Sequence, residues 1–88
     1  MEYEDLEGKY FTYLEPQYDS AKSFYKKAKV YNVGRCLYLV SYKTVVAQYD
    51  TLTGNYIING KYSCTTTRHI REFTRQIGLD YKDLTKYM

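Results

Sequence analysis

The sequence has few of the residues that would place it among secreted, membrane or metal-binding proteins. It has two cysteines, Cys36 and Cys64, whereas a secreted chain of 88 residues would ordinarily need several disulfides. Its single histidine, His69, and the cysteines lack the paired spacing of a zinc site. No apolar run approaches the roughly 20 residues of a membrane span, and the first residues are acidic where a signal peptide is basic. We therefore expect a cytoplasmic protein with reduced thiols and without a cofactor, a metal or a membrane partner.

Motifs for nucleotide binding and catalysis are also missing. The five glycines are scattered along the chain, which gives no glycine-rich loop for phosphate. No sequence neighbour of His69 resembles a nucleophile motif, and one small domain offers little shelter from water. We therefore predict that the protein is not an enzyme. The expected role of His69 is a hydrogen bond from its ring to a backbone carbonyl or to a hydroxyl of the preceding turn.

The residues that are present suffice for one domain with a thin core. Leu, Ile, Val and Phe together provide 19 of the 88 residues, just above the range in which chains fail to fold. Tyrosine provides 13 residues. These tyrosines either fill the core in place of Leu and Phe or face outward as part of a binding surface, where tyrosine is enriched. A chain of this size buries only about 60% of its unfolded surface, so a homodimer or a larger partner would relieve the thin core.

Charge is divided unevenly along the chain. Residues 1–19 carry a net charge of −5 and residues 20–88 a net charge of +8. We therefore divide the chain into an acidic N-terminal arm, 1–19, and a single α+β domain, 20–88. Either the arm folds back over the basic domain and neutralises it, or the basic surface serves an acidic partner.

The pattern of apolar and turn residues predicts an α+β fold, in which a small antiparallel sheet of three to four strands packs against one principal C-terminal helix. The expected strands are residues 30–33, two strands within 35–48, and a hairpin that pairs 45–49 with 56–59. Residues 9–15 are either an edge strand or a loose arm. Phe24 and Ala28, four residues apart, suggest one helical turn within 20–29, and Asp80 and Asp83 suit a short final helix.

The principal helix is predicted to begin near Thr65 or Thr66 and to stop at Gly78, because hydroxyl residues favour N-caps and glycine favours helix ends. Helical geometry places Ile70, Phe73 and Ile77 within about 60° of one another, facing the sheet. The opposite side carries a stripe of three arginines. The hydroxyl residues at the helix start either cap the helix or form an anion site together with its N-terminus.

Basic and tyrosine residues are the features that suggest a partner. Guanidinium groups pair with phosphate or carboxylate through two aligned hydrogen bonds, and tyrosines stack on unpaired bases. A solvated helix face is the ordinary alternative for the arginines. The predicted partner-binding residues are Arg68, Arg71, Arg75, Lys26, Lys27, Lys29, Tyr25 and Tyr31.

Two segments carry a resemblance to other proteins: Ser41-Tyr42-Lys43-Thr44-Val45-Val46-Ala47 and Tyr62-Ser63-Cys64-Thr65-Thr66-Thr67-Arg68-His69-Ile70-Arg71-Glu72-Phe73. Over about residues 23–78 the chain resembles a family of small uncharacterised proteins from bacteriophages and related mobile elements. The resemblance implies a phage origin and carries no activity with it. Our hypothesis is a binding protein that inhibits a host protein or nucleoprotein, such as a CRISPR nuclease, in the host cytoplasm. A nucleic-acid-binding phage regulator is the alternative.

Overall fold

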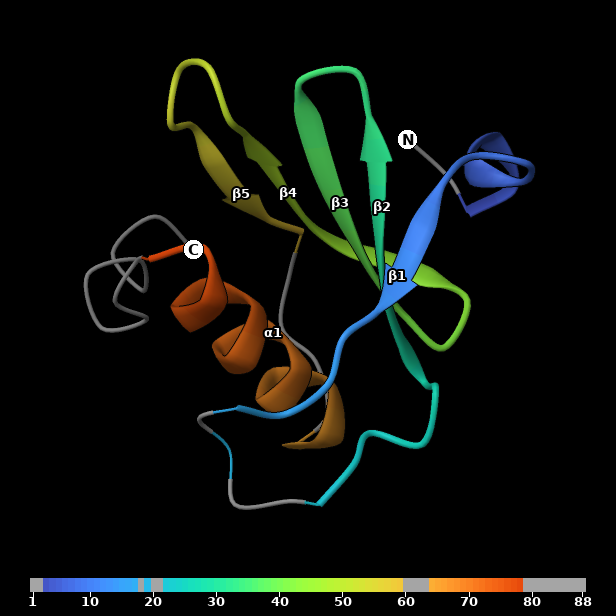
Figure 1. The fold of residues 1–88 in the computed structure, drawn as a ribbon, viewed down its shortest axis with the longest axis vertical. Coiled ribbons are helices and arrows are strands. Elements are labelled where there is room, and N and C mark those ends of the chain that lie inside the picture. The colour runs from blue at the N-terminus through green and yellow to red at the C-terminus, as the bar shows by residue number, and fades with distance from the viewer. Residues whose placement is uncertain (1–2, 18, 20–21, 60–63, 79–88) are drawn as a thin grey trace.

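A computed structural model describes residues 3–17, 19, 22–59 and 64–78 of the chain. Its elements, in chain order, are the 3₁₀ helix η1 (Tyr3–Leu6), strands β1 (Phe11–Tyr13), β2 (Ala28–Val33), β3 (Cys36–Ser41), β4 (Thr44–Asp50) and β5 (Tyr56–Ile58), and helix α1 (Cys64–Gln76). The strands form one antiparallel sheet in the order β1-β2-β3-β4-β5, and α1 lies against it (Figure 1). The predicted α+β class is confirmed.

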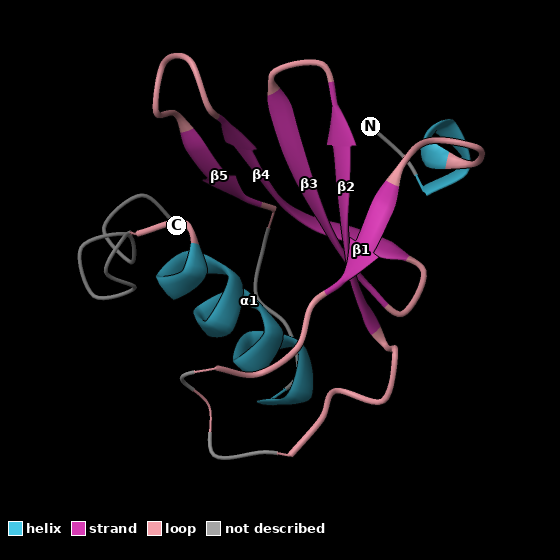
Figure 2. Ribbon diagram, in the orientation of Figure 1, coloured by secondary structure: helices cyan, strands magenta, loops and turns pink. Residues whose placement is uncertain are grey.

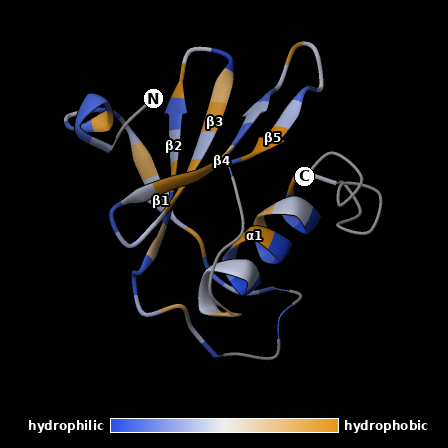
Figure 3. Ribbon diagram, turned by 180° about the vertical axis from the view of Figure 1, so that it is seen from behind, coloured by the Kyte–Doolittle hydropathy of each residue, from blue (hydrophilic) through white to orange (hydrophobic). Residues whose placement is uncertain are grey.

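The sheet has five strands where three to four were expected, because β1, within the segment expected as either an edge strand or a loose arm, pairs with β2 at one edge; β5, the expected second strand of the hairpin, forms the other edge (Figure 2). Its centre is β3 and β4, whose residues include the β-branched and aromatic types that suit a pleated surface. A register shift between Leu39 and Val40 marks a bulge in this pair. The hydrophobic stretch of β4 crosses the middle of the sheet in Figure 3.

Helix α1 buries the face that its sequence predicts. Ile70 and Phe73 are each 2% exposed and pack in one cluster with Leu39 of β3 and Val46 of β4. The three arginines of the helix are exposed, on the other side. The helix begins at Cys64, one residue before the earlier of the two expected positions. It stops as predicted before Gly78, whose φ of 88° is one that glycine adopts without strain.

The other face of the sheet is covered by the N-terminal segment. Leu6 of η1 is fully buried and packs in a second cluster with Tyr31, Val40 and Val45. The described part of residues 1–19 is therefore packed against the rest of the domain on both sides of the sheet, because Leu14 belongs to the cluster under α1.

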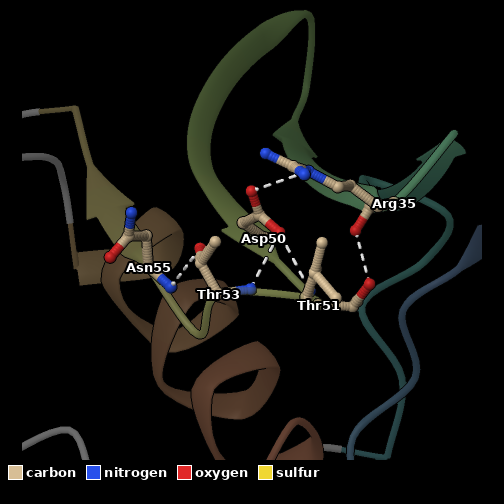
Figure 4. Close-up of polar contacts among 6 residues, drawn as sticks. Arg35, Asp50, Thr51, Thr53 and Asn55 are labelled. Carbon is tan, nitrogen blue, oxygen red and sulfur yellow. Dashed lines mark hydrogen bonds and ion pairs between the residues drawn. The ribbon is translucent and has the colours of Figure 1, made fainter.

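The loop between β4 and β5 is fixed by its own polar groups (Figure 4). Asp50 accepts hydrogen bonds from the backbone N–H groups of Leu52 and Thr53 and forms an ion pair with Arg35 at 3.0 Å. Burial acts to raise the pKa of Asp50, but these hydrogen bonds and the Arg35 charge outweigh it and hold that pKa below its ordinary value. The predicted hairpin is thus confirmed, with a loop held by an aspartate turn.

The expectation of a helical turn within residues 20–29 is wrong. The chain instead makes a tight turn in which the N–H of Lys27 donates to the carbonyl of Phe24 at 3.0 Å. Tyr25 and Lys26, the central residues, have φ values of 53° and 63°, in the left-handed region that a right-handed helix cannot use. The short helix expected around Asp80 and Asp83 lies outside the described residues.

Candidate functional site

The centre of the site is a buried hydrogen-bond cluster between β3 and α1. The Nδ1 atom of His69 lies 2.9 Å from Ser41 Oγ, which lies 3.0 Å from Thr66 Oγ1. All three residues are buried, and His69 is only 1% exposed. The ring of His69 also contacts the ring of Phe24, with 4.6 Å between centroids. The predicted kind of interaction, from the ring to a hydroxyl, is present, but its partner comes from β3 and not from the preceding turn.

The environment keeps His69 uncharged. Burial lowers its pKa below the ordinary value, and the positive charges of Arg68 and Lys27 lower it further, while Asp19 opposes them. Arg68 donates from Nε to Asp19 Oδ2 at 3.0 Å and from Nη2 to Asp19 Oδ1. The imidazole therefore acts as a neutral hydrogen-bonding group at neutral pH.

Above His69 lies a cavity of about 220 Å³, which we term the His69 pocket. Three aromatic side chains line it, Phe24, Tyr25 and Tyr42. Its other lining residues are the cations Lys27 and Arg68, the hydroxyl residues Ser23 and Thr65, and His69. None of the described lining residues is acidic, although the Asp19 carboxylate pairs with Arg68 and the Glu15 carboxylate accepts a hydrogen bond from Ser23.

The two ring nitrogens of His69 differ in their contacts. Among the described residues, no fully buried side-chain nitrogen or oxygen lacks a hydrogen-bond partner. The Nδ1 atom of His69 has its partner in Ser41, while Nε2 has none within the described chain. His69 is also one of the residues that line the pocket.

Two strained turns form the walls of the pocket. Within the described ranges, the non-glycine residues with positive φ are Tyr25, Lys26 and Tyr42. Two of them line the pocket and the third, Lys26, is next to Tyr25. Left-handed backbone at such residues costs about 1–3 kcal/mol each and clusters at functional sites. The strained backbone holds two tyrosines at the surface: Tyr25 is 74% exposed and Tyr42 is 49% exposed.

The two turns are also locked to each other. The N–H of Tyr42 donates to the carbonyl of Lys27 at 2.7 Å, and Ala28 pairs with Ser41 in the sheet. The Nζ atom of Lys27 lies 5.7 Å from the centre of the Tyr42 ring, a cation–π distance. The ring of Tyr42 in turn lies 6.2 Å from that of His69. The pocket is therefore preformed by backbone and ring contacts.

The structure brings together only part of the predicted partner-binding set. Arg68, Lys27 and Tyr25 line the His69 pocket. Lys26 is exposed next to it, with its Nζ 5.7 Å from the Tyr13 ring.

Two predicted contact residues lie on the other face of the sheet. Tyr31 is 4% exposed, so it is a core residue and not an open contact surface; burial, followed by the neighbouring Tyr3, raises the pKa of its hydroxyl. Lys29 is half-buried, with its Nζ 5.1 Å from the Phe11 ring and 5.9 Å from the Tyr3 ring. Alternation along β2 places both side chains away from α1.

Arg71 and Arg75 are exposed on α1 and line a separate hollow of about 260 Å³ with Asp19 and Glu72. Glu72 is 2% exposed and accepts hydrogen bonds from the Asp19 N–H at 2.8 Å and from Gln76 Nε2 at 2.6 Å. Acidic groups therefore line this hollow together with the arginines, whereas the acidic group that pairs with Arg68, Asp19, is not among the described residues that line the His69 pocket.

Sequence reasoning missed Tyr42, Phe24 and the position of His69 in the pocket. Tyr42 had a detectable signal, because a two-residue hairpin loop ordinarily carries Asn or Gly where this chain has Tyr-Lys. Phe24 and His69 had none, because their meeting depends on the packing of distant segments.

Other kinds of site find no support in the described part of the chain. Its His, Cys, Asp and Glu residues do not gather in threes as a metal ion would need. Cys36 and Cys64 are free thiols. None of the described helices has the length and apolar character to cross a bilayer.

Comparison with known proteins gives one result. The model of a family of unknown function, DUF8033, matches residues 12–86. No curated protein and no solved structure matches the chain.

Proposed function

We propose that this chain, which belongs to the DUF8033 family of unknown function, is a non-enzymatic binding protein that inhibits a host protein or nucleoprotein. An anti-CRISPR-like defence inhibitor of phage type, acting in the host cytoplasm, is the specific form of this proposal. The contact surface is the His69 pocket and the two turns that surround it.

The observation that supports this proposal most is the use of strained turns to expose tyrosine. Tyr25 and Tyr42 stand where Gly or Asn would relieve the backbone, so their side chains are the reason for their presence. Each tyrosine is followed in its turn by an exposed lysine, Lys26 or Lys43. Exposed, preorganised tyrosines beside cations are typical of binding hot spots. The partner that fits this surface is acidic.

Direct nucleic-acid binding by a phage regulator is the second candidate. It is favoured by the open ring of Tyr25, which offers a stacking surface, and by the neighbouring lysines, which suit phosphates. The two candidates differ in the molecule that the chain captures, and in how strongly salt weakens the capture.

A capture experiment tests the proposal. The tagged full chain is mixed with a bacterial host lysate, with and without nuclease, and the bound proteins are identified. We expect a host protein that is retained by the wild type and lost with Tyr25→Gly. Each captured protein is then assayed with the purified chain added, and loss of its activity is the expected result.

The control is Tyr10→Gly, because Tyr10 is 71% exposed and lies outside the pocket. Capture should survive this substitution. Capture of the same proteins by Tyr25→Gly, or of no protein by the wild type at low salt, contradicts the proposal. Capture of naked nucleic acid alone supports the second candidate.

A further inference from the structure

The His69 pocket has the chemistry of a site for one particular kind of anion. Its described lining includes two cations: Lys27, and Arg68, which is paired with the carboxylate of Asp19. Arg68 uses two of its five N–H donors on Asp19, which leaves donors for a ligand. Asp19 also holds the guanidinium in place. A phosphate group is the anion that such a fixed guanidinium and a neighbouring ammonium recognise well.

The same pocket also has groups that suit a flat, hydrogen-bonding ring. The rings of Tyr25 and Tyr42 flank it, and base–aromatic stacking contributes about 1–3 kcal/mol per base in other proteins. His69, which is 1% exposed and held by Ser41, gives the pocket a rigid lining residue with a polar ring. Hydroxyl groups of Ser23 and Thr65 add to the polar lining.

Size and surroundings favour a chain of nucleotides over a small anion. The cavity of about 220 Å³ is below the range of about 300–1,000 Å³ for drug-sized ligands, so it admits one nucleotide at most. Exposed lysines outside it, Lys26 and Lys43, would meet the phosphates of neighbouring nucleotides. A phosphopeptide offers a single phosphate and leaves these lysines without a partner.

We propose that the His69 pocket holds one unpaired nucleotide of a single-stranded nucleic acid, with its base against the tyrosine rings and its phosphate at Lys27 and Arg68. This inference rests on the proposed function, and it identifies the nucleic-acid part of a nucleoprotein as the group that the chain contacts.

The test uses the single histidine of the chain as the reporter. Labelled full-length protein is titrated with a single-stranded decanucleotide while the imidazole NMR signals of His69 are followed. We expect saturable shifts of these signals. If about three phosphates are neutralised, affinity should fall about 20-fold between 50 and 200 mM salt. The Tyr25→Gly variant should bind about tenfold more weakly, and Tyr10→Gly should bind as the wild type does.

Comparison ligands decide between the sources of phosphate. If adenosine monophosphate binds as tightly as the decanucleotide, the proposal of a nucleic-acid strand is wrong and the ligand is a free nucleotide. If a phosphotyrosine peptide shifts the His69 signals at a lower concentration than the decanucleotide does, the proposal of a nucleic-acid ligand is wrong. Unshifted His69 signals, or unchanged affinity in Tyr25→Gly, also overturn the inference. If capture of an inhibited host protein still depends on Tyr25 in that case, the proposed function stands and only this inference fails.

Discussion

Replacement of Tyr25 by glycine should stabilise the fold while it removes the main exposed ring of the candidate site. Tyr25 has a φ of 53°, and its side chain is 74% exposed. The backbone N–H of Tyr25 donates a hydrogen bond to Ser23 Oγ at 2.9 Å. Glycine has the same backbone N–H, so the substitution leaves this donor in place. The substitution therefore acts almost entirely on backbone strain.

The expected magnitude follows from two opposing terms. Left-handed backbone costs an L-residue about 1–2 kcal/mol, which glycine does not incur. Glycine also gives the unfolded chain more conformational entropy, which lowers the stability of the folded state by about 0.4–1 kcal/mol and so offsets part of this gain. The net gain is about 0.5–1 kcal/mol. In a domain of this size that corresponds to a rise in Tm of about 2–6 °C.

Thermal unfolding followed by circular dichroism measures this effect, with Tyr10→Gly as the matched control. Tyr10 is nearly as exposed as Tyr25, at 71%, but has no positive φ. Its replacement should lower Tm, because only the entropy of the unfolded chain changes. A fall in Tm of several degrees for Tyr25→Gly would refute the argument, since it would show that the ring stabilises the fold and that the turn is unstrained.

Three further predictions concern the core. Burial lowers the pKa of His69, so the imidazole binds a proton more readily in the unfolded state than in the folded state. The free energy of unfolding should therefore be unaffected by this group above a pH of about 6.5 and should fall below that pH. The Tm of His69→Gln should depend less on pH over this range. Equal pH dependence in both proteins would contradict this. Leu6→Ala should lower the free energy of unfolding by about 2–5 kcal/mol in urea titrations, because Leu6 is fully buried; an unchanged midpoint would show that η1 does not cover the sheet. Phe73→Asp should unfold the domain, since an unpaired charge would replace a ring that is 2% exposed, and cooperative melting near the wild-type Tm would argue against the orientation of α1.

The sequence was most informative where a local pattern and the tertiary fold agree. The spacing of Ile70 and Phe73 correctly predicts the buried face of α1, and Gly78 correctly predicts its end. The turn residues 50–55 correctly predict the β4–β5 hairpin. In each case the deciding interactions lie within one element or between neighbours in the chain.

Prediction failed where distant segments or backbone strain decide the structure. The spacing of Phe24 and Ala28 suggests a helical turn, yet both are buried under α1 by a left-handed turn that no propensity favours. Tyr31 looked like a contact residue, but η1 and the far face of the sheet bury it. Most of the His69 pocket was likewise not apparent, because it joins residues from 23 to 69 that meet only after packing.

The strand order of the sheet determines when the candidate site comes into existence. Each strand pairs with its neighbour along the chain, and the connections from β2 to β5 are short, so this part of the sheet can assemble from local contacts. The bond between Ser41 and His69 spans 28 positions and forms only when α1 docks. During synthesis the chain emerges with its N-terminus first, so the residues of β1 to β5 leave the ribosome before those of α1. The candidate site therefore exists only once α1 has docked on the sheet.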